Sequence, residues 1–189
     1  MAVEPFLVST GVVALAEIGD KTQLLSMCIA ARFRRPLPIV LGILIATILN
    51  HFAAGLAGTL VGDLLAGPWM RWILGASFLA VAVWALFPDK LESDGVPKGR
   101  WGAFGATAVA FFLAEIGDKT QIATVALAAK YHAVLLVTLG TTLGMMIANV
   151  PAVLVGGALA DRLPLRAVRV AAAIVFTLLG IAALAGVGG

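Results

Sequence analysis

Leu15-Ala16-Glu17-Ile18-Gly19-Asp20-Lys21-Thr22-Gln23 occurs again, without change, as Leu113-Ala114-Glu115-Ile116-Gly117-Asp118-Lys119-Thr120-Gln121, 98 positions later. Each copy lies inside a long apolar stretch of the chain. A charged side chain at bilayer depth costs several kcal/mol unless it is paired or hydrated, so carboxylates in such a place are candidates for function. We therefore expect both the fold and the activity to be organised around this repeated motif.

The composition indicates a protein whose helices lie in lipid. Of its 189 residues, 61% are hydrophobic and 12% are charged, and the mean hydropathy is +1.06. A helix of about 20 apolar residues crosses a hydrocarbon layer of about 30 Å. Six stretches have about that length or more, namely residues 5–31, 37–60, 69–87, 101–129, 134–159 and 165–187. The sequence therefore predicts an all-α polytopic membrane protein with six transmembrane helices.

A polar stretch at residues 88–100 divides the chain into two similar halves. It is rich in proline, glycine and charged residues, which is typical of a linker. We predict a first three-helix repeat at 1–87, a cytoplasmic linker at 88–100 and a second three-helix repeat at 101–189, all within one integral membrane domain. Because three is an odd number of crossings, the second repeat enters the membrane from the opposite face. The two repeats are therefore predicted to be inverted.

The basic residues of the loops predict how the chain is oriented. Nine Lys and Arg residues fall in or beside the loops that follow the first, third and fifth spans, and two fall in the remaining loops. Short loops rich in Lys and Arg stay in the cytoplasm. We therefore expect these three loops in the cytoplasm and both termini outside. The net charge of +3 is explained by these basic loop residues, which determine topology and do not indicate a phosphate-binding face. No nucleic-acid partner is expected.

Charged residues within each motif are spaced to share one face of a helix. Glu17 lies three positions before Asp20 and four before Lys21, and the second copy has the same spacing. Gly19 and Gly117 permit either a close approach of backbones or a break in the helix. Broken helices near the middle of an inverted repeat are a recurring feature of ion sites in transporters. The sequence leaves open which of the two roles the glycines have.

Two inverted copies are expected to bring four carboxylates together, those of Glu17, Asp20, Glu115 and Asp118. With both motif lysines charged, two positive and four negative charges leave −2, which matches one divalent cation. Secondary candidates for the site are Lys21, Thr22, Gln23, Lys119, Thr120, Gln121 and Asn149. The oxygen donors in this set suit Mn²⁺, Ca²⁺ or Mg²⁺ rather than Cu(I) or a thiolate zinc site.

A structural interpretation competes with the metal site. Within one helix, Glu17 and Lys21 would form a self-neutralising pair four residues apart. The repetition of the whole nine-residue block, with an additional aspartate, favours the functional interpretation. Asn149 aligns with His51 at the offset of the motif. For His51, Asn149 and the neighbouring Asn50 the favoured interpretation is interhelical hydrogen bonding, with Asn149 lining the ion pathway as the alternative.

The doubled motif also resembles that of a known family. Two copies of Glu-x-Gly-Asp-Lys/Arg-Ser/Thr in a duplicated six-span membrane protein are similar to the Golgi-type manganese/calcium–proton exchangers, also called uncharacterised protein family 16, within the lysine-exporter superfamily. The resemblance covers nearly the whole chain. It implies cation binding by Glu17, Asp20, Glu115 and Asp118. Similarity to the short bacterial members implies a multi-pass manganese exporter of the plasma (inner) membrane.

The leading prediction is a secondary active transporter, not an enzyme, that exports Mn²⁺ from the cytoplasm by antiport with protons through alternating access. Its partners are the divalent ion, protons and the lipid bilayer. No cofactor is expected, because the metal ion is the transported substrate. The alternatives are a Ca²⁺/H⁺ antiporter of the same fold and an exporter of a basic amino acid. The oligomeric state stays open, with a homodimer as one candidate.

An intramembrane hydrolase is the alternative from another functional class. The chain has two histidines, His51 and His132, and they form no His-Glu-x-x-His motif. The sequence also lacks the Gly-x-x-x-x-Gly-Lys-Ser/Thr loop that binds nucleotide phosphates. Both observations favour a transporter that ion gradients drive.

Overall fold

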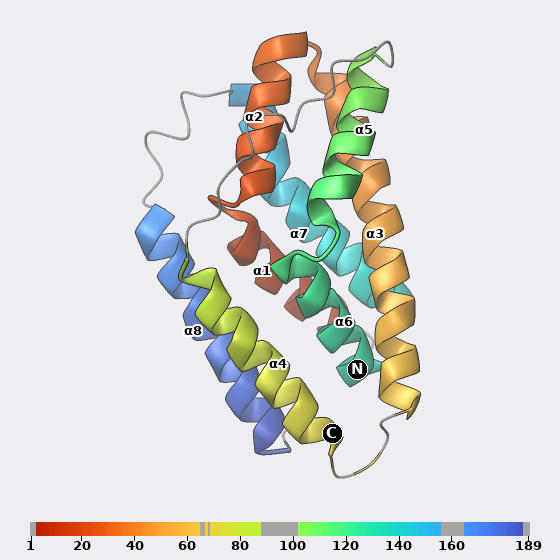
Figure 1. The fold of residues 1–189 in the computed structure, drawn as a ribbon, viewed down its shortest axis with the longest axis vertical. Helices are drawn as coiled ribbons and strands as arrows, with labels where there is room; N and C mark the ends of the chain where they lie inside the picture. Colours follow the sequence, from red (N-terminus) through yellow and green to blue (C-terminus); the bar gives the residue numbers. More distant parts are fainter. Residues whose placement is uncertain (1–2, 65–66, 68, 88–101, 156–164, 187–189) are drawn as a thin grey trace.

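The computed structural model describes residues 3–64, 67, 69–87, 102–155 and 165–186, whose regular secondary structure is α-helical (Figure 1). The eight helices are α1 (Glu4–Glu17), α2 (Lys21–Phe33), α3 (Pro36–Leu64), α4 (Met70–Ala85), α5 (Gly102–Glu115), α6 (Lys119–Tyr131), α7 (Val134–Val155) and α8 (Leu165–Leu184). The predicted linker at 88–100 and the end of the fifth predicted span, at 156–159, lie outside the described residues.

Both copies of the motif interrupt a helix. The stretch predicted as the first span forms α1 and α2, and the stretch predicted as the fourth forms α5 and α6. In each link between the short helices the central residue is a glycine with positive φ, +81° at Gly19 and +75° at Gly117. This left-handed conformation costs other L-residues roughly 1–2 kcal/mol. The motif glycines therefore allow the helix to break at this point.

The glutamine at the end of each motif fixes the link. Gln23 Oε1 accepts a hydrogen bond from the backbone N–H of Gly19 at 2.8 Å, and Gln121 Oε1 accepts one from Gly117 at 2.7 Å. These bonds satisfy backbone donors that the break removes from the helical ladder. The identical sequences thus produce the same local structure twice.

Each broken helix packs against the long helix of the other half of the chain. A Cβ placed on Gly42 of α3 would lie 2.8 Å from the carbonyl oxygen of Phe104 in α5. At the equivalent place in the other half, a Cβ on Gly140 of α7 would lie 2.5 Å from the carbonyl oxygen of Phe6 in α1. Small residues let helix backbones approach closely in lipid, where apolar burial provides little driving force. This close packing brings the two motifs into one region of the molecule.

The two halves of the chain follow opposite directions. In Figure 1, α3 runs from the top of the view to the bottom, whereas α7 runs from the bottom to the top. Likewise α2 ascends, while α5 and α6 descend. Beside this core α4 and α8 pack on each other, with the stacked rings of Phe78 and Phe176 6.5 Å apart between centroids.

Large apolar side chains are exposed on the outside of the helices, and the carboxylates of the motifs lie within. Leu49, Leu139 and Ile181 are more than half exposed, whereas the carboxylates of the motifs are buried. Among the described residues, three segments are long and apolar enough to cross a membrane, Pro36–Leu64, Val134–Val155 and Arg166–Leu184. The short helices of the broken pairs have 13 or 14 residues each. One such helix spans about 20 Å, so it does not reach across a layer of about 30 Å alone.

Candidate functional site

The two helix breaks place four carboxylates in equivalent positions. Glu17 is the last residue of α1 and Glu115 is the last residue of α5. Asp20 and Asp118 come directly before α2 and α6, with extended backbone conformations. The prediction that Glu17, Asp20 and Lys21 share one face of a continuous helix is wrong for this structure, because the break lies between Glu17 and Lys21.

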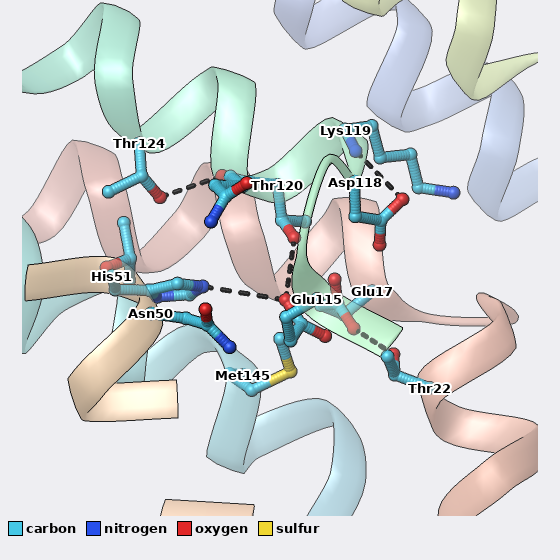
Figure 2. Close-up of polar contacts among 12 residues, drawn as sticks. Glu17, Thr22, Asn50, His51, Glu115, Asp118, Lys119, Thr120, Thr124 and Met145 are labelled. Carbon is cyan, nitrogen blue, oxygen red and sulfur yellow. Dashed lines mark hydrogen bonds and ion pairs between the residues drawn. The ribbon is translucent and has the colours of Figure 1, made fainter. Parts of the chain in front are cut away.

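Three of the four carboxylates form one cluster. Glu17, Glu115 and Asp118 are fully buried, and each provides an oxygen within 4.8 Å of the oxygens of the other two (Figure 2). Two ligands of a single cation with bonds of 2.1–2.4 Å lie at most about 4.2–4.8 Å apart. Separations within this limit allow the three carboxylates to converge on one ion. Asp20, which the sequence also predicts as a ligand, is not in this cluster.

The motif lysines pair with the aspartates of the opposite copy. Lys119 donates to Asp20, and the Nζ of Lys21 lies 3.5 Å from an oxygen of Asp118. Lys119 is buried, whereas the Lys21 side chain is 27% exposed. The pair between Glu17 and Lys21 within one helix, which the sequence allowed, is not the arrangement of this structure. The lysines instead join the two halves of the chain.

A threonine of each motif donates to the glutamate across the break. The Thr22 hydroxyl donates to Glu17 Oε2 at 2.5 Å, and the Thr120 hydroxyl donates to Glu115 Oε2 at 3.2 Å (Figure 2). All four side chains are buried. These bonds orient the carboxylates and use one of the two lone pairs of the accepting oxygen in each. The threonines thus position the glutamates.

The secondary candidates Gln23 and Asn149, and the neighbouring Asn50, use their side-chain amides in hydrogen bonds to the backbone. The Gln23 Nε2 group donates to the carbonyl oxygen of Ala148 in α7 at 2.9 Å. Asn149 donates to the carbonyl oxygen of Met145 at 3.1 Å, within α7 itself. Asn50 donates to the carbonyl oxygen of Phe112 at 3.0 Å and so joins α3 to α5. The interhelical bond predicted for Asn50 is therefore present, whereas these bonds of Asn149 stay within its own helix.

His51 lies beside the cluster, which the sequence did not predict. Its Nε2 is 3.7 Å from Glu115 Oε2, and the side chain is fully buried (Figure 2). His51 aligns with Asn149 at the offset of the motifs, so the sequence contained a signal for a special role at this position. The interhelical hydrogen bond predicted for the His51 side chain is not formed among the described residues.

Several buried oxygens of the cluster have no hydrogen-bond donor among the described residues. They are Glu17 Oε1, Glu115 Oε1 and Asp118 Oδ2. A buried polar atom that lacks a partner costs about 1–3 kcal/mol, more when it is charged. A cation at the cluster would satisfy such oxygens. Because the atoms available to bind a metal are carboxylate and hydroxyl oxygens, the arrangement is chemically suited to a hard divalent cation.

Comparisons with known proteins agree with this chemistry. The profile of a family described as divalent cation/proton antiporter GDT1 matches residues 5–93 and 103–187. A Vibrio cholerae protein named "Putative manganese exporter" is 50% identical over 93% of this chain and 88% of its own length. A GDT1-like protein of Synechocystis sp. is 29% identical over 89% of this chain and 91% of its own length. No solved structure matches the chain.

Proposed function

The chain belongs to the divalent cation/proton antiporter GDT1 family, and from this premise we propose that it exports Mn²⁺ from the cytoplasm in exchange for protons. The observation that carries the proposal is the cluster of Glu17, Glu115 and Asp118 at the two helix breaks. The relative named "Putative manganese exporter" supports the choice of metal. We propose that the ion binds these three carboxylates, with Asp20 as a fourth ligand in part of the transport cycle.

The charges of the site support a divalent substrate. Lys119 pairs with Asp20 and Lys21 pairs with Asp118, so each aspartate has a cation of the opposite motif beside it. The charges of Glu17 and Glu115 then leave −2 in a buried site. One divalent cation balances this charge, whereas a monovalent ion would leave a net charge at low dielectric.

Exchange with protons follows from the type of ligand. A carboxylate must release its proton before it binds a metal ion, so metal and protons compete for the same oxygens. If the site faces the cytoplasm when it binds metal and the outside when it binds protons, each cycle moves the two in opposite directions. The helix breaks support such a cycle, because discontinuous helices at the middle of inverted repeats are where transporters bind ions and rearrange.

We propose six membrane crossings in two inverted repeats, 1–87 and 101–189, joined by a cytoplasmic linker at 88–100. Each broken pair, α1 with α2 and α5 with α6, would make one crossing. The opposite chain directions of the two halves and the nine-to-two division of loop basic residues support this topology. The membrane would be the plasma (inner) membrane, with both termini outside. A homodimer has no support from the comparisons, and the site consists of residues of one chain.

Calcium remains the second candidate substrate, since the family description names divalent cations in general. Carboxylate and hydroxyl oxygens would serve Ca²⁺ as well as Mn²⁺. A basic amino acid has no support from the comparisons.

The decisive experiment uses purified protein in liposomes with the membrane voltage clamped. Mn²⁺ movement is followed by a fluorescent indicator while a pH difference is imposed across the membrane. We expect Mn²⁺ to accumulate in the compartment from which protons leave, and excess Ca²⁺ to compete weakly. Transport that ignores the pH difference would identify a channel or uniporter. Transport of Ca²⁺ with exclusion of Mn²⁺ would select the second candidate.

A further inference from the structure

His51 places imidazole nitrogen atoms, a second type of potential metal ligand, beside the carboxylate cluster. It lies on α3, whereas the carboxylates come from the two helix breaks. Its side chain is fully buried and lies beside a carboxylate oxygen of the cluster. Neither ring nitrogen has a hydrogen-bond partner among the described residues. A buried imidazole ordinarily has at least one such partner, so this arrangement calls for an explanation.

The distance to Glu115 fits a shared ion. Two ligands each about 2.2 Å from one cation are about 3.1 Å apart at a right angle and about 4.4 Å apart in line. The 3.7 Å between His51 Nε2 and Glu115 Oε2 lies between these limits and beyond a hydrogen bond. The two atoms are therefore placed to bind the same ion from neighbouring directions.

From this geometry we infer that His51 is a nitrogen ligand of the transported ion, and that the substrate class is a first-row divalent transition metal. The inference rests on the proposed function and deepens it. In its neutral form imidazole has one nitrogen lone pair free for a metal. Ca²⁺ and Mg²⁺ take oxygen ligands, whereas a nitrogen donor favours transition metals over both. His51 therefore gives the site its preference for Mn²⁺ over Ca²⁺ and Mg²⁺.

The two halves of the chain differ at this position. At the offset of the motifs His51 corresponds to Asn149, so the duplication supplies one imidazole and one amide. The side chain of Asn149 donates to the backbone and sulfur of Met145, within its own helix. A ligand set built from the two identical motifs would consist of oxygens alone. The asymmetry at this position is what adds the nitrogen.

The first test is spectroscopic and leaves His51 intact. In a His132→Asn variant carrying a tag without histidine, His51 is the one imidazole of the chain. This protein is labelled with ¹⁵N-histidine, loaded with Mn²⁺ and studied by electron spin-echo spectroscopy. We expect the Mn²⁺ spin echo to be modulated by a directly bound nitrogen. This modulation should change when ¹⁴N-histidine replaces ¹⁵N-histidine. His132 is half exposed and lies beside Asp63, away from the cluster, so the replacement should preserve Mn²⁺ binding.

Bound Mn²⁺ without nitrogen modulation would overturn the inference while leaving the proposed function in place. Failure of the wild-type protein to bind or transport Mn²⁺ would overturn both. The two failures are thus distinguishable, and neither reading depends on whether a His51 variant folds.

The second test measures selectivity. His51→Asn copies the residue of the other half and replaces the nitrogen donor with an amide oxygen. We expect the preference for Mn²⁺ over Ca²⁺, measured by competition during transport in liposomes, to fall by at least about tenfold. Removing a residue that only hydrogen-bonds to a metal ligand already lowers metal affinity by about that factor. The matched control, His132→Asn, should keep the wild-type preference. An unchanged preference in His51→Asn would contradict the assignment.

Discussion

Lys119 forms an ion pair with Asp20, which lies 99 positions earlier in the chain on the other copy of the motif. Both side chains are buried. Asp20 lies in the link directly before α2, and Lys119 is the first residue of α6. The pair therefore neutralises an aspartate and also joins the two halves at the site itself. A movement of one half relative to the other would have to preserve or exchange this contact.

Removal of one partner of that pair should be strongly destabilising. We expect Lys119→Met or Asp20→Asn alone to lower the free energy of unfolding by about 3–5 kcal/mol, because each breaks a buried ion pair from one side only. The double variant should lose less than the sum of the single losses. Thermal or denaturant unfolding of the four proteins in detergent forms the double-mutant cycle. Strict additivity would show that the two residues are not coupled.

The glutamates of the cluster should contribute strongly to metal binding. Glu17→Gln and Glu115→Gln keep the shape of the side chain but remove the negative charge. If a charge-assisted contact contributes about 1.5–3 kcal/mol, Mn²⁺ affinity should fall roughly ten- to hundredfold in each. Isothermal titration with Mn²⁺ measures the change, with Glu4→Gln, an exposed residue at the start of α1, as the control. Wild-type affinity in both cluster variants would exclude the site.

The helix break should depend on its glycine. Gly117→Ala places a Cβ in open space but at a φ of +75°, so the variant should lose roughly 1–2 kcal/mol of stability and transport more slowly. Gly11, in the interior of α1, also has open space around it, and its φ is not positive. Gly11→Ala should therefore be neutral or slightly stabilising. Melting temperatures and transport rates compare the two. Equal effects would show that backbone strain at the break is unimportant.

Metal affinity should rise with pH. Protons and Mn²⁺ compete for the carboxylate oxygens, so a higher proton concentration must weaken metal binding and a lower one must strengthen it. Titration of the protein in detergent with Mn²⁺ at several pH values measures the trend, and the release of protons on binding measures the same linkage directly. Binding that is independent of pH and releases no protons would contradict exchange at these ligands.

The proposed topology can be tested by labelling. In a Cys28→Ala background, a cysteine introduced within residues 89–98 should react with a membrane-impermeant reagent only from the cytoplasm. One introduced after Gly186 should react only from outside. These expectations follow from the basic residues of the loops. Reaction of both positions from the same side would exclude an odd number of crossings between them.

The sequence by itself determined the class of protein and the location of its chemistry. The identical blocks beginning at Leu15 and Leu113, set in apolar segments, identified charged residues that lipid would not tolerate without a function. They also identified the family, which the comparisons confirm. These conclusions need no coordinates, because they depend on composition, spacing and repetition along one chain.

Only the tertiary structure decided which of these residues meet. A helical spacing argument assumes an unbroken helix, and the positive φ at Gly19 and Gly117 ends that periodicity between the glutamate and the lysine of each motif. Lys21 and Lys119 consequently reach the opposite copy, and His51 reaches Glu115 from a third element. Contacts between segments so far apart in the chain depend on how helices cross and how closely their backbones approach. That packing is set by the whole assembly of helices, and no local pattern in the sequence encodes it.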